Sequence, residues 1–240
     1  MSLRESGEKP LTYSSPAILE RRRRILEETR TLIAEQGIGN FSMNELCERA
    51  HVAKRTLYNA FQTRERLIAT AIQEYFLEYL SRIQYQGEVG TLQRNVERIV
   101  AVGRRNRKIR NYIRAIMAVY FGPDGVPDIW QAMHSIAVES NLEWIHNLQK
   151  RRQLQPWVDA GTLANDIVRF EYATINDWAR GLIADEDFVP NLLTSYLTFM
   201  LGATRGAARS EIEEMIRDLS EGRFTVPAPL VTPMETPASE

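Results

Sequence analysis

Apolar residues recur at helical spacing along most of the chain. Between Pro16 and Gly37 they stand three or four positions apart, which places their side chains on one face of a helix. Pro16 suits the first position of a helix, and Gly37 suits the left-handed conformation that often follows the last one. The sequence S-M-N-E at 42–45 has the pattern of a capping box and predicts a helix that runs to about Ala50. A short helix is predicted next, at about 54–60.

A longer apolar stripe follows these short segments. Thr63 is a suitable cap for a helix that runs to about Tyr85, and at 1.5 Å per residue such a helix would be about 33 Å long. The same periodicity predicts further helices at about 91–105, 107–121, 128–152, 161–184, 189–203 and 207–221. No strand-like alternation of useful length occurs, so the sequence predicts an all-α protein.

The chain has 240 residues, of which 44% are hydrophobic, and this length allows one large domain or two modest ones. From Arg223 onward prolines are frequent and apolar residues are few, a composition typical of disorder. We therefore predict a flexible N-terminal arm over residues 1–15, a helical domain over 16–66, a larger helical domain over 67–222, and a disordered tail over 223–240.

Residues 45–61, ELCERAHVAKRTLYNAF, contain two short predicted helices joined by a tight turn. Apolar side chains stand where they would pack on the preceding helix, at Leu46, Ala50, Val52, Leu57 and Phe61. The second helix carries a dense block of polar side chains, at Lys54, Arg55, Thr56, Tyr58 and Asn59. The DNA major groove is about 12 Å wide and admits one helix. The pattern therefore predicts a helix-turn-helix whose second helix enters that groove.

Four stretches in this part of the chain resemble the TetR family of transcriptional regulators. They are R-x-x-I-L at 22–26, L-I-A-E-Q-G at 32–37, the helix start at Ser42, and V-A-K-R-T-L-Y-N-A-F at 52–61. The resemblance covers about residues 21–67 as a motif. The helical layout of the remaining chain agrees loosely with the ligand-binding and dimerisation domain of the family.

Three positions depart from the family pattern. His51 stands where a glycine usually makes the turn, and histidine tolerates a positive φ better than most residues. Ala53 stands where a serine would cap the second helix, so a contribution of about 1 kcal/mol is expected to be missing. Arg55 replaces a small residue at the start of the recognition helix.

The resemblance implies a homodimer that binds an inverted-repeat operator in double-stranded DNA, with recognition helices about 34–36 Å apart. It also implies an effector pocket in the C-terminal helices and repression that is released when a small molecule moves the fourth helix. We therefore predict a sequence-specific transcriptional regulator that acts as a ligand-responsive repressor. The alternative is a helical small-molecule-binding or protein-interaction module without a DNA function.

The predicted DNA contacts combine base recognition with phosphate binding. Arg55 can donate two hydrogen bonds to guanine, or it can bind a phosphate, and Thr56 can contact a thymine methyl group or a phosphate. Lys54, Tyr58 and Arg64 are expected to hold phosphates, which set the register on the duplex. The full set of candidate DNA-binding residues is Arg23, Ser42, Lys54, Arg55, Thr56, Tyr58, Asn59 and Arg64.

The net charge of −1 hides an uneven distribution. Residues 1–66 hold 12 basic and 9 acidic side chains, a balance of +3, whereas residues 67–240 hold 18 and 22, a balance of −4. Four arginines stand together at 21–24, where cations near a helix N-terminus oppose the helix dipole. Nearby DNA phosphates would favour such a run, and a solvated helix face is the alternative interpretation.

The C-terminal half is rich in aromatic and sulfur-containing side chains, which are typical of apolar ligand pockets and of ordinary cores. The candidate effector-binding residues are Met117, Tyr120, Phe121, Trp130, Met133, His134, Trp144, Tyr172 and Asn176, with Asn141 as a further polar anchor. The resemblance places a dimer interface on the last long helices. Its candidate residues are Leu193, Tyr196, Leu197, Met200 and Leu201, for which packing inside the protomer is the alternative.

Nothing in the sequence indicates catalysis, a metal or another cofactor. Cys47 is the only cysteine, which excludes an intramolecular disulfide, and His134 and His146 lack metal-ligand spacing. Nucleotide-binding glycine motifs are absent. No apolar run approaches the roughly 20 residues of a membrane span, and the N-terminal stretch lacks an apolar signal region. We expect a cytoplasmic, non-enzymatic protein with no membrane partner.

Overall fold

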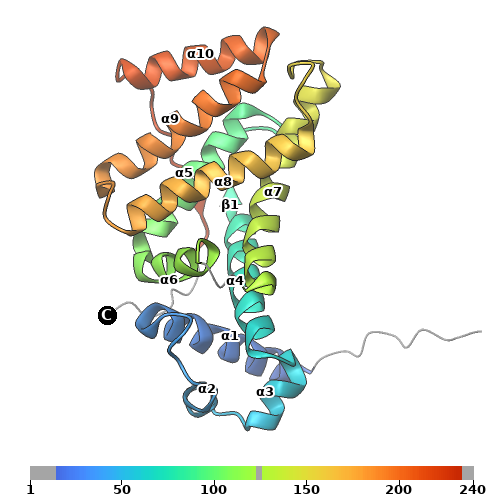
Figure 1. Ribbon diagram of the computed structural model, residues 1–240, viewed down its shortest axis with the longest axis vertical. Coiled ribbons are helices and arrows are strands. Elements are labelled where there is room, and N and C mark those ends of the chain that lie inside the picture. Colours follow the sequence, from blue (N-terminus) through green and yellow to red (C-terminus); the bar gives the residue numbers. More distant parts are fainter. Residues whose placement is uncertain (1–14, 123–125, 234–240) are drawn as a thin grey trace, which may run out of the picture.

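Ten helices account for most of the computed structural model, which describes residues 15–122 and 126–233 (Figure 1). The predicted all-α class is confirmed. In the described residues, strand structure is confined to β1 and β2, of two residues each. The elements are α1 (Pro16–Gln36), α2 (Met43–Arg49), α3 (Lys54–Phe61), α4 (Arg64–Ser81), β1 (Ile83–Gln84), α5 (Leu92–Lys108), α6 (Arg110–Tyr120), α7 (Pro127–Lys150), α8 (Ala160–Ala179), α9 (Asp185–Ala203), α10 (Gly206–Ser220) and β2 (Leu230–Val231).

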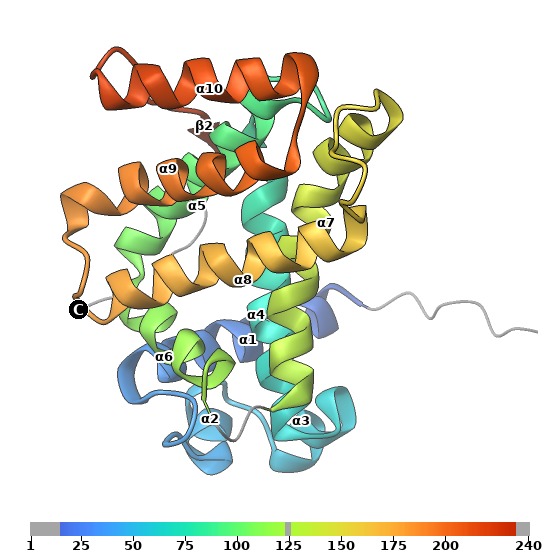
Figure 2. The ribbon, with the colours of Figure 1, turned by 45° about the horizontal axis from the view of Figure 1, so that its top comes forward.

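Helices α1, α2 and α3 form one end of the molecule, and α4 leads from them into the larger group of helices (Figures 1 and 2). The predicted cap of α2 is present, because the Ser42 hydroxyl accepts a hydrogen bond from the Glu45 amide at 3.1 Å. Leu46, Leu57 and Phe61 are buried, with α2 packed on α1 and α3 packed on α2 and α4. This packing leaves the opposite face of α3 at the surface.

The turn between α2 and α3 has the geometry expected from its unusual residues. His51 adopts a positive φ of 51°, which confirms that it takes the conformation usually given to glycine. Ala53 provides no side-chain cap to α3. The turn is closed instead by the backbone, where the Val52 amide donates to the Cys47 carbonyl at 3.0 Å.

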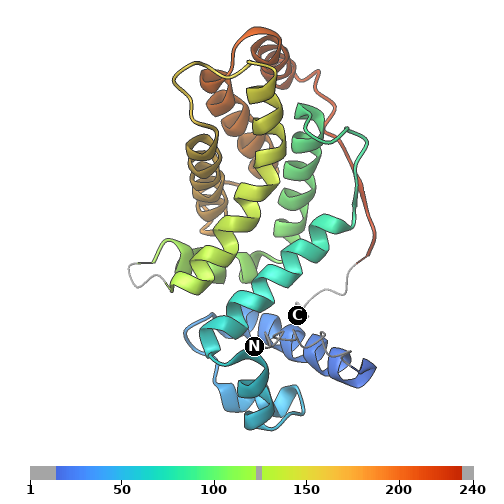
Figure 3. The same ribbon diagram turned by 90° about the vertical axis from the view of Figure 1, so that its right-hand side faces the viewer.

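In the larger group of helices, α4 lies along α7, and α8 packs on both α7 and α9 (Figures 2 and 3). The cores of the two ends join in one cluster of buried apolar residues that runs from α1 to α10. The DNA-recognition candidate α3 is therefore connected to the C-terminal helices through a continuous packed interior. Interiors of this kind transmit displacement because they are close-packed.

Three helix ends differ from the predictions by four residues or more. Helix α4 ends at Ser81 instead of Tyr85, since the next residues form β1. Helix α8 ends at Ala179, where Gly181 with a φ of 84° turns the chain. Helix α9 begins at Asp185 instead of position 189, because the three acidic residues at 185–187 form its first turn, where their negative charge interacts favourably with the helix dipole.

The C-terminal segment also differs from the disorder that its composition predicts. Strand β2 pairs antiparallel with β1, so that Val231 lies opposite Ile83. The Thr232 amide donates to the Arg82 carbonyl at 3.3 Å, and the Arg82 guanidinium donates to the Pro233 carbonyl. These contacts attach the segment to the end of α4. The rest of the predicted tail, residues 234–240, and residues 1–14 of the predicted arm lie outside the described residues.

Candidate nucleic-acid interface and interior pocket

The exposed face of α3 carries most of the side chains that the sequence nominates for DNA contact. Lys54, Arg55 and Asn59 are exposed, and 38% of Tyr58 is exposed. Among the described residues, none forms a side-chain hydrogen bond or ion pair with Arg55. The Lys54 ammonium donates to the Asn44 side-chain oxygen at 3.2 Å, which links α3 to α2. The face therefore offers one available guanidinium with flanking polar groups.

Two other candidate DNA-binding residues already have partners within the protein. Arg23 lies 3.1 Å from the Glu20 carboxylate and 3.3 Å from that of Glu27, both on its own helix. The hydrogen bond from Arg23 holds the pKa of Glu20 below its usual value. Arg64 donates to the Ile38 carbonyl and so fastens the start of α4 to the loop after α1. Both side chains have structural contacts in addition to any role in DNA binding.

The arginine run at 21–24 does not present four unengaged cations. Arg22 pairs with Glu74 of α4 and lies 5.0 Å from the centre of the Phe61 ring. Arg24 donates through Nε to the Ala50 carbonyl at 2.8 Å and so caps the end of α2. Much of the run therefore stabilises the packing of α1 against its neighbours, which neither sequence interpretation anticipated.

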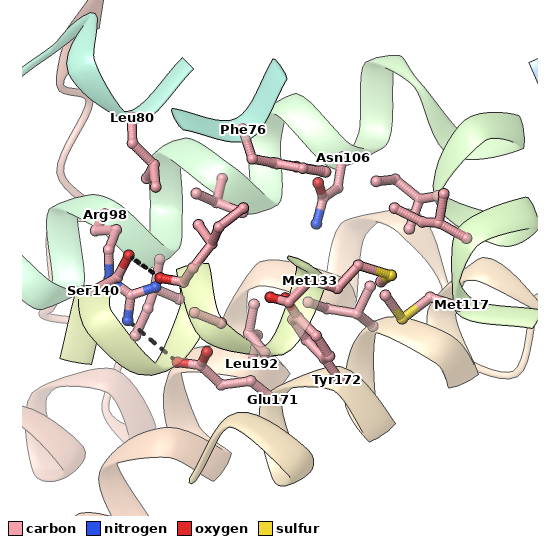
Figure 4. Close-up of a pocket in the computed structure, with 17 residues that line it drawn as sticks. Phe76, Leu80, Arg98, Asn106, Met117, Met133, Ser140, Glu171, Tyr172 and Leu192 are labelled. Carbon is pink, nitrogen blue, oxygen red and sulfur yellow. Dashed lines mark hydrogen bonds and ion pairs between the residues drawn. The ribbon is translucent and has the colours of Figure 1, made fainter. Parts of the chain in front are cut away.

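An interior pocket lies between α4, α5, α6, α7, α8 and α9, with a cavity volume of about 70 Å³ (Figure 4). Its wall is mostly apolar, with a small number of polar groups. Phe76 and Leu80 bring α4 into this wall. Of the candidate effector-binding residues, the structure places three in the wall, namely Met117, Met133 and Tyr172.

The other candidate effector-binding residues lie outside this wall. Tyr120, Trp130 and His134 stack with one another next to the pocket, and the Tyr120 ring meets Tyr172 edge-on at 4.9 Å. Trp144 is buried against the Tyr196 ring. Phe121 and Asn176 also lie outside the wall. Phe121 is exposed, and Asn176 is partly buried.

The buried ion pair of the pocket, Arg98 with Glu171, was not predicted, whereas their neighbour Asn141 was named as a polar anchor. Arg98 donates to the Asn141 side-chain oxygen at 2.9 Å and lies 3.4 Å from the Glu171 carboxylate, and all three side chains are buried. Burial raises the pKa of Glu171 against the opposing attraction of Arg98. A sequence signal exists, because Glu171 stands in the apolar stripe of α8, between Ile167 and Ile175.

Two buried polar atoms of residues that line the pocket have no partner among the described residues. They are the side-chain oxygen of Asn106 and the Nε atom of Arg98. Asn106 points toward the interior space (Figure 4). Buried polar groups without a partner cost free energy, so these atoms favour a ligand that supplies a hydrogen-bond donor and an acceptor.

His134 is held as a neutral imidazole by its two neighbours. Asn165 uses its NH₂ group to donate to the Gly161 carbonyl, so its oxygen accepts from Nε2 of His134 at 2.8 Å. Nδ1 then accepts from the Tyr120 hydroxyl, also at 2.8 Å. Burial lowers the pKa of His134, with the Asn165 hydrogen bond opposing the change.

This geometry predicts a stability loss on mild acidification. Because the pKa of His134 is lower in the folded than in the unfolded chain, the stabilisation is complete above the unfolded value and is lost as pH falls through the folded value. We expect His134→Gln to flatten the pH dependence of the unfolding free energy between about pH 7.5 and 5, by at most about 1.4 kcal/mol per pH unit. Urea unfolding measures this. His146→Gln is the control, since His146 is exposed, and equal slopes in native and His134→Gln proteins would contradict the prediction.

The predicted dimer-interface residues require a correction. Leu193, Tyr196, Leu197 and Met200 are at most 1% exposed in the single protomer, so they pack in its core, which was the alternative interpretation. Leu201 is only partly buried. The error follows from helical geometry, since these residues form the inward stripe of α9.

The outward side of α8 and α9 carries different apolar groups. Phe170 is 42% exposed, and its ring lies 5.7 Å from that of the partly buried Phe199. Exposed threonines and the glycine Gly202 surround Phe199 on α9. An aromatic pair among small residues is a suitable surface for close helix packing.

Among the described residues, no helix is long and apolar enough to cross a membrane. Within residues 15–122 and 126–233, no three His, Cys, Asp or Glu side chains gather as metal ligands would.

The chain is similar to known proteins both in the sequence of its N-terminal part and in its fold. Residues 25–71 match the family described as bacterial regulatory proteins, tetR family. No curated protein matches the chain. Similar solved structures include TylP, a TetR regulator from Streptomyces fradiae, with 15% identity, coverage of 86% of this chain and 99% of TylP, and a TM-score of 0.60.

Two further structures share the fold. GusR of Salmonella enterica is 24% identical, with 79% of this chain and 98% of GusR covered and a TM-score of 0.57. NalD, the secondary repressor of the MexAB-OprM multidrug efflux pump in Pseudomonas aeruginosa, is 16% identical, with 78% and 98% covered and a TM-score of 0.53. At these identities the likeness establishes a shared fold.

Proposed function

We propose that this chain, a DNA-binding transcriptional regulator by its TetR-family N-terminal domain and its fold, is a repressor that a small molecule releases from its operator. One observation carries the proposal: α4 forms part of the pocket wall, and only two residues separate its start from the end of α3. A displacement of the pocket wall is therefore also a displacement at the recognition helix. NalD, which shares the fold, is a repressor.

The size of the pocket supports a mechanism that requires movement. Ligand sites usually enclose about 300–1,000 Å³, far more than the cavity of about 70 Å³ between these helices. An effector can enter only if the walls separate. Because Phe76 and Leu80 of α4 contribute to the wall, expansion of the pocket pushes α4. That movement changes the position of α3 relative to its copy in a dimer.

The lining also indicates the chemical class of the effector. Most of the wall is apolar, and the unpartnered atoms of Asn106 and Arg98 offer one acceptor and one donor. Glu171 already balances the charge of Arg98. The site therefore favours a largely apolar, uncharged molecule that carries a hydroxyl or amide group.

The proposed homodimer would use the outward side of α8 and α9. Phe170 and Phe199 supply an apolar centre, and the small residues beside them permit close approach of a second copy. Two-fold symmetry would place the two α3 helices in successive major grooves, about 34–36 Å apart. The expected DNA site is an inverted repeat.

The first test is selection of bound sequences from a random double-stranded DNA pool, with the full chain at near-physiological salt. Enrichment of an inverted repeat with half-sites about one helical turn apart would support the proposal. Compounds of the stated class are then screened for release of that site. Absence of any enriched sequence would contradict the proposal and favour the alternative module without a DNA function.

A further inference from the structure

A second pocket lies between α5 and the C-terminal segment, with a cavity volume of about 420 Å³. Arg104, Arg105 and Lys108 line it from α5, Tyr79 lines it from α4, and residues 229–233 form the opposite wall. Figure 3 shows this segment descending beside β1. The pairing of β2 with β1 holds the wall in place. The pocket is separate from the interior pocket, since the two share no lining residue.

The lining of this second pocket is strongly basic. It contains three cations, and no carboxylate of a described residue is part of it. Arg104 and Lys108 are exposed, and neither forms an ion pair with a described residue. Glu78, on the adjoining helix, is paired with Arg82. The charge of the pocket is therefore not balanced by the part of the protein that the structure describes.

Arg105 is the buried member of this group, with 8% of its surface exposed. Its Nε donates to the Tyr75 hydroxyl, and its guanidinium lies 5.4 Å and 5.8 Å from the centres of the Tyr75 and Tyr79 rings. Its Nη2 atom is buried and has no hydrogen-bond partner among the described residues. A buried guanidinium without an anionic partner is costly, because desolvation of the charge is not compensated.

We propose that this pocket binds a small oxyanion, in particular the phosphate group of a metabolite. Arginine side chains bind phosphate oxygens through paired, charge-assisted hydrogen bonds, and lysine adds a point charge. Arg105 supplies the buried donor, while Arg104 and Lys108 complete the charge at the entrance. A DNA phosphate is a different source of the same chemistry, but α5 lies on the opposite side of α1 from α2 and α3 (Figure 1).

The position of the site gives the anion a route to the DNA-binding domain. The Tyr75 ring that contacts Arg105 also lies 5.4 Å from the guanidinium of Arg30, which belongs to α1. Nε of Arg30 is likewise buried without a partner among the described residues. An anion at Arg105 would therefore add negative charge at the junction between α1, α4 and α5.

The test is isothermal titration of the full chain with pyrophosphate, in a chloride buffer at constant ionic strength. The native protein is expected to bind, and the double variant Arg104→Gln/Lys108→Gln is expected to bind at least about tenfold more weakly, since two charge-assisted hydrogen bonds to the anion are lost. Both side chains are exposed, so the variant should fold as the native protein does. Its thermal unfolding curve checks this.

Arg107→Gln is the matched control, because Arg107 is an exposed cation on the same helix that does not line the pocket. Its affinity for pyrophosphate should stay within about twofold of the native value. The proposal is overturned if the native protein does not bind, if the double variant binds as well as the native protein, or if Arg107→Gln loses as much affinity as the double variant. A different outcome would assign the binding to the DNA surface instead: pyrophosphate displaces bound random-sequence DNA, and the double variant binds pyrophosphate as tightly as the native protein.

Discussion

Replacing Glu171 by glutamine is expected to lower the free energy of unfolding by about 3–5 kcal/mol, the usual effect of removing one partner of a buried ion pair. The substitution keeps the shape of the side chain and removes its charge, so Arg98 is left charged and buried. Denaturant unfolding at neutral pH measures the change. Glu213→Gln is the control, because Glu213 forms an exposed pair with Arg209 at 2.9 Å, and its loss should cost no more than about 1 kcal/mol.

The double variant Arg98→Met/Glu171→Leu separates the charge from the packing. Its unfolding free energy should lie closer to the native value than that of Glu171→Gln, since an apolar pair can replace a buried ion pair with little loss. Asn141 keeps its contact with the Tyr196 hydroxyl at 2.9 Å, so its oxygen does not become unpartnered. A change below about 1 kcal/mol in Glu171→Gln would show that Glu171 is already protonated in the folded protein.

Arg55→Ala is expected to weaken binding to the selected DNA site by about 1–3 kcal/mol, which is roughly fivefold to 150-fold, while binding to random DNA changes much less. The structure supports this because Arg55 is exposed on α3 and its guanidinium is not engaged by described residues. Competition binding with both DNAs at one salt concentration measures the difference. Equal losses of affinity for both DNAs would show that Arg55 contacts a phosphate and does not read a base.

Two lysine variants calibrate that result. Lys54→Ala should weaken binding to both DNAs about equally and reduce the salt slope by about one, as expected for loss of one phosphate contact. Lys150→Ala removes the same charge from the end of α7, away from α3, and should leave the slope unchanged. If Lys150→Ala lowered the slope as much as Lys54→Ala, the effect would reflect net charge alone.

The short helices of the N-terminal domain were predictable because their signals are local. A capping serine, a glycine at a helix end and an apolar face at helical spacing lie within a few residues of each other. Ser42 and Leu57 take the predicted roles, and Gly37 ends α1 with a positive φ of 82°, although its ψ of 163° is extended and not left-handed helical. The turn at His51 was predictable for the same reason. Such features depend on neighbours in the chain, which the sequence displays directly.

The features that sequence analysis missed depend on partners distant in the chain. Arg98 and Glu171 are 73 positions apart, so no local sequence pattern predicts that they pair. The partner of Arg22 is on α4, and that of Arg24 is at the end of α2. The dimer candidates failed differently, since an apolar stripe such as that of Leu193 and Leu197 does not reveal which neighbour covers it.

The attachment of the C-terminal segment to β1 has a consequence for how the chain folds. Arg82 and Pro233 are 151 positions apart, and closing so long a loop costs conformational entropy. The few hydrogen bonds of the short ladder offset this cost only after the loop has closed. A ladder of two residues per strand cannot form independently of the helices that bring its strands together. Its formation is therefore expected to be the last step of folding, and protection of the Thr232 amide from hydrogen exchange would report that every helix before it has docked.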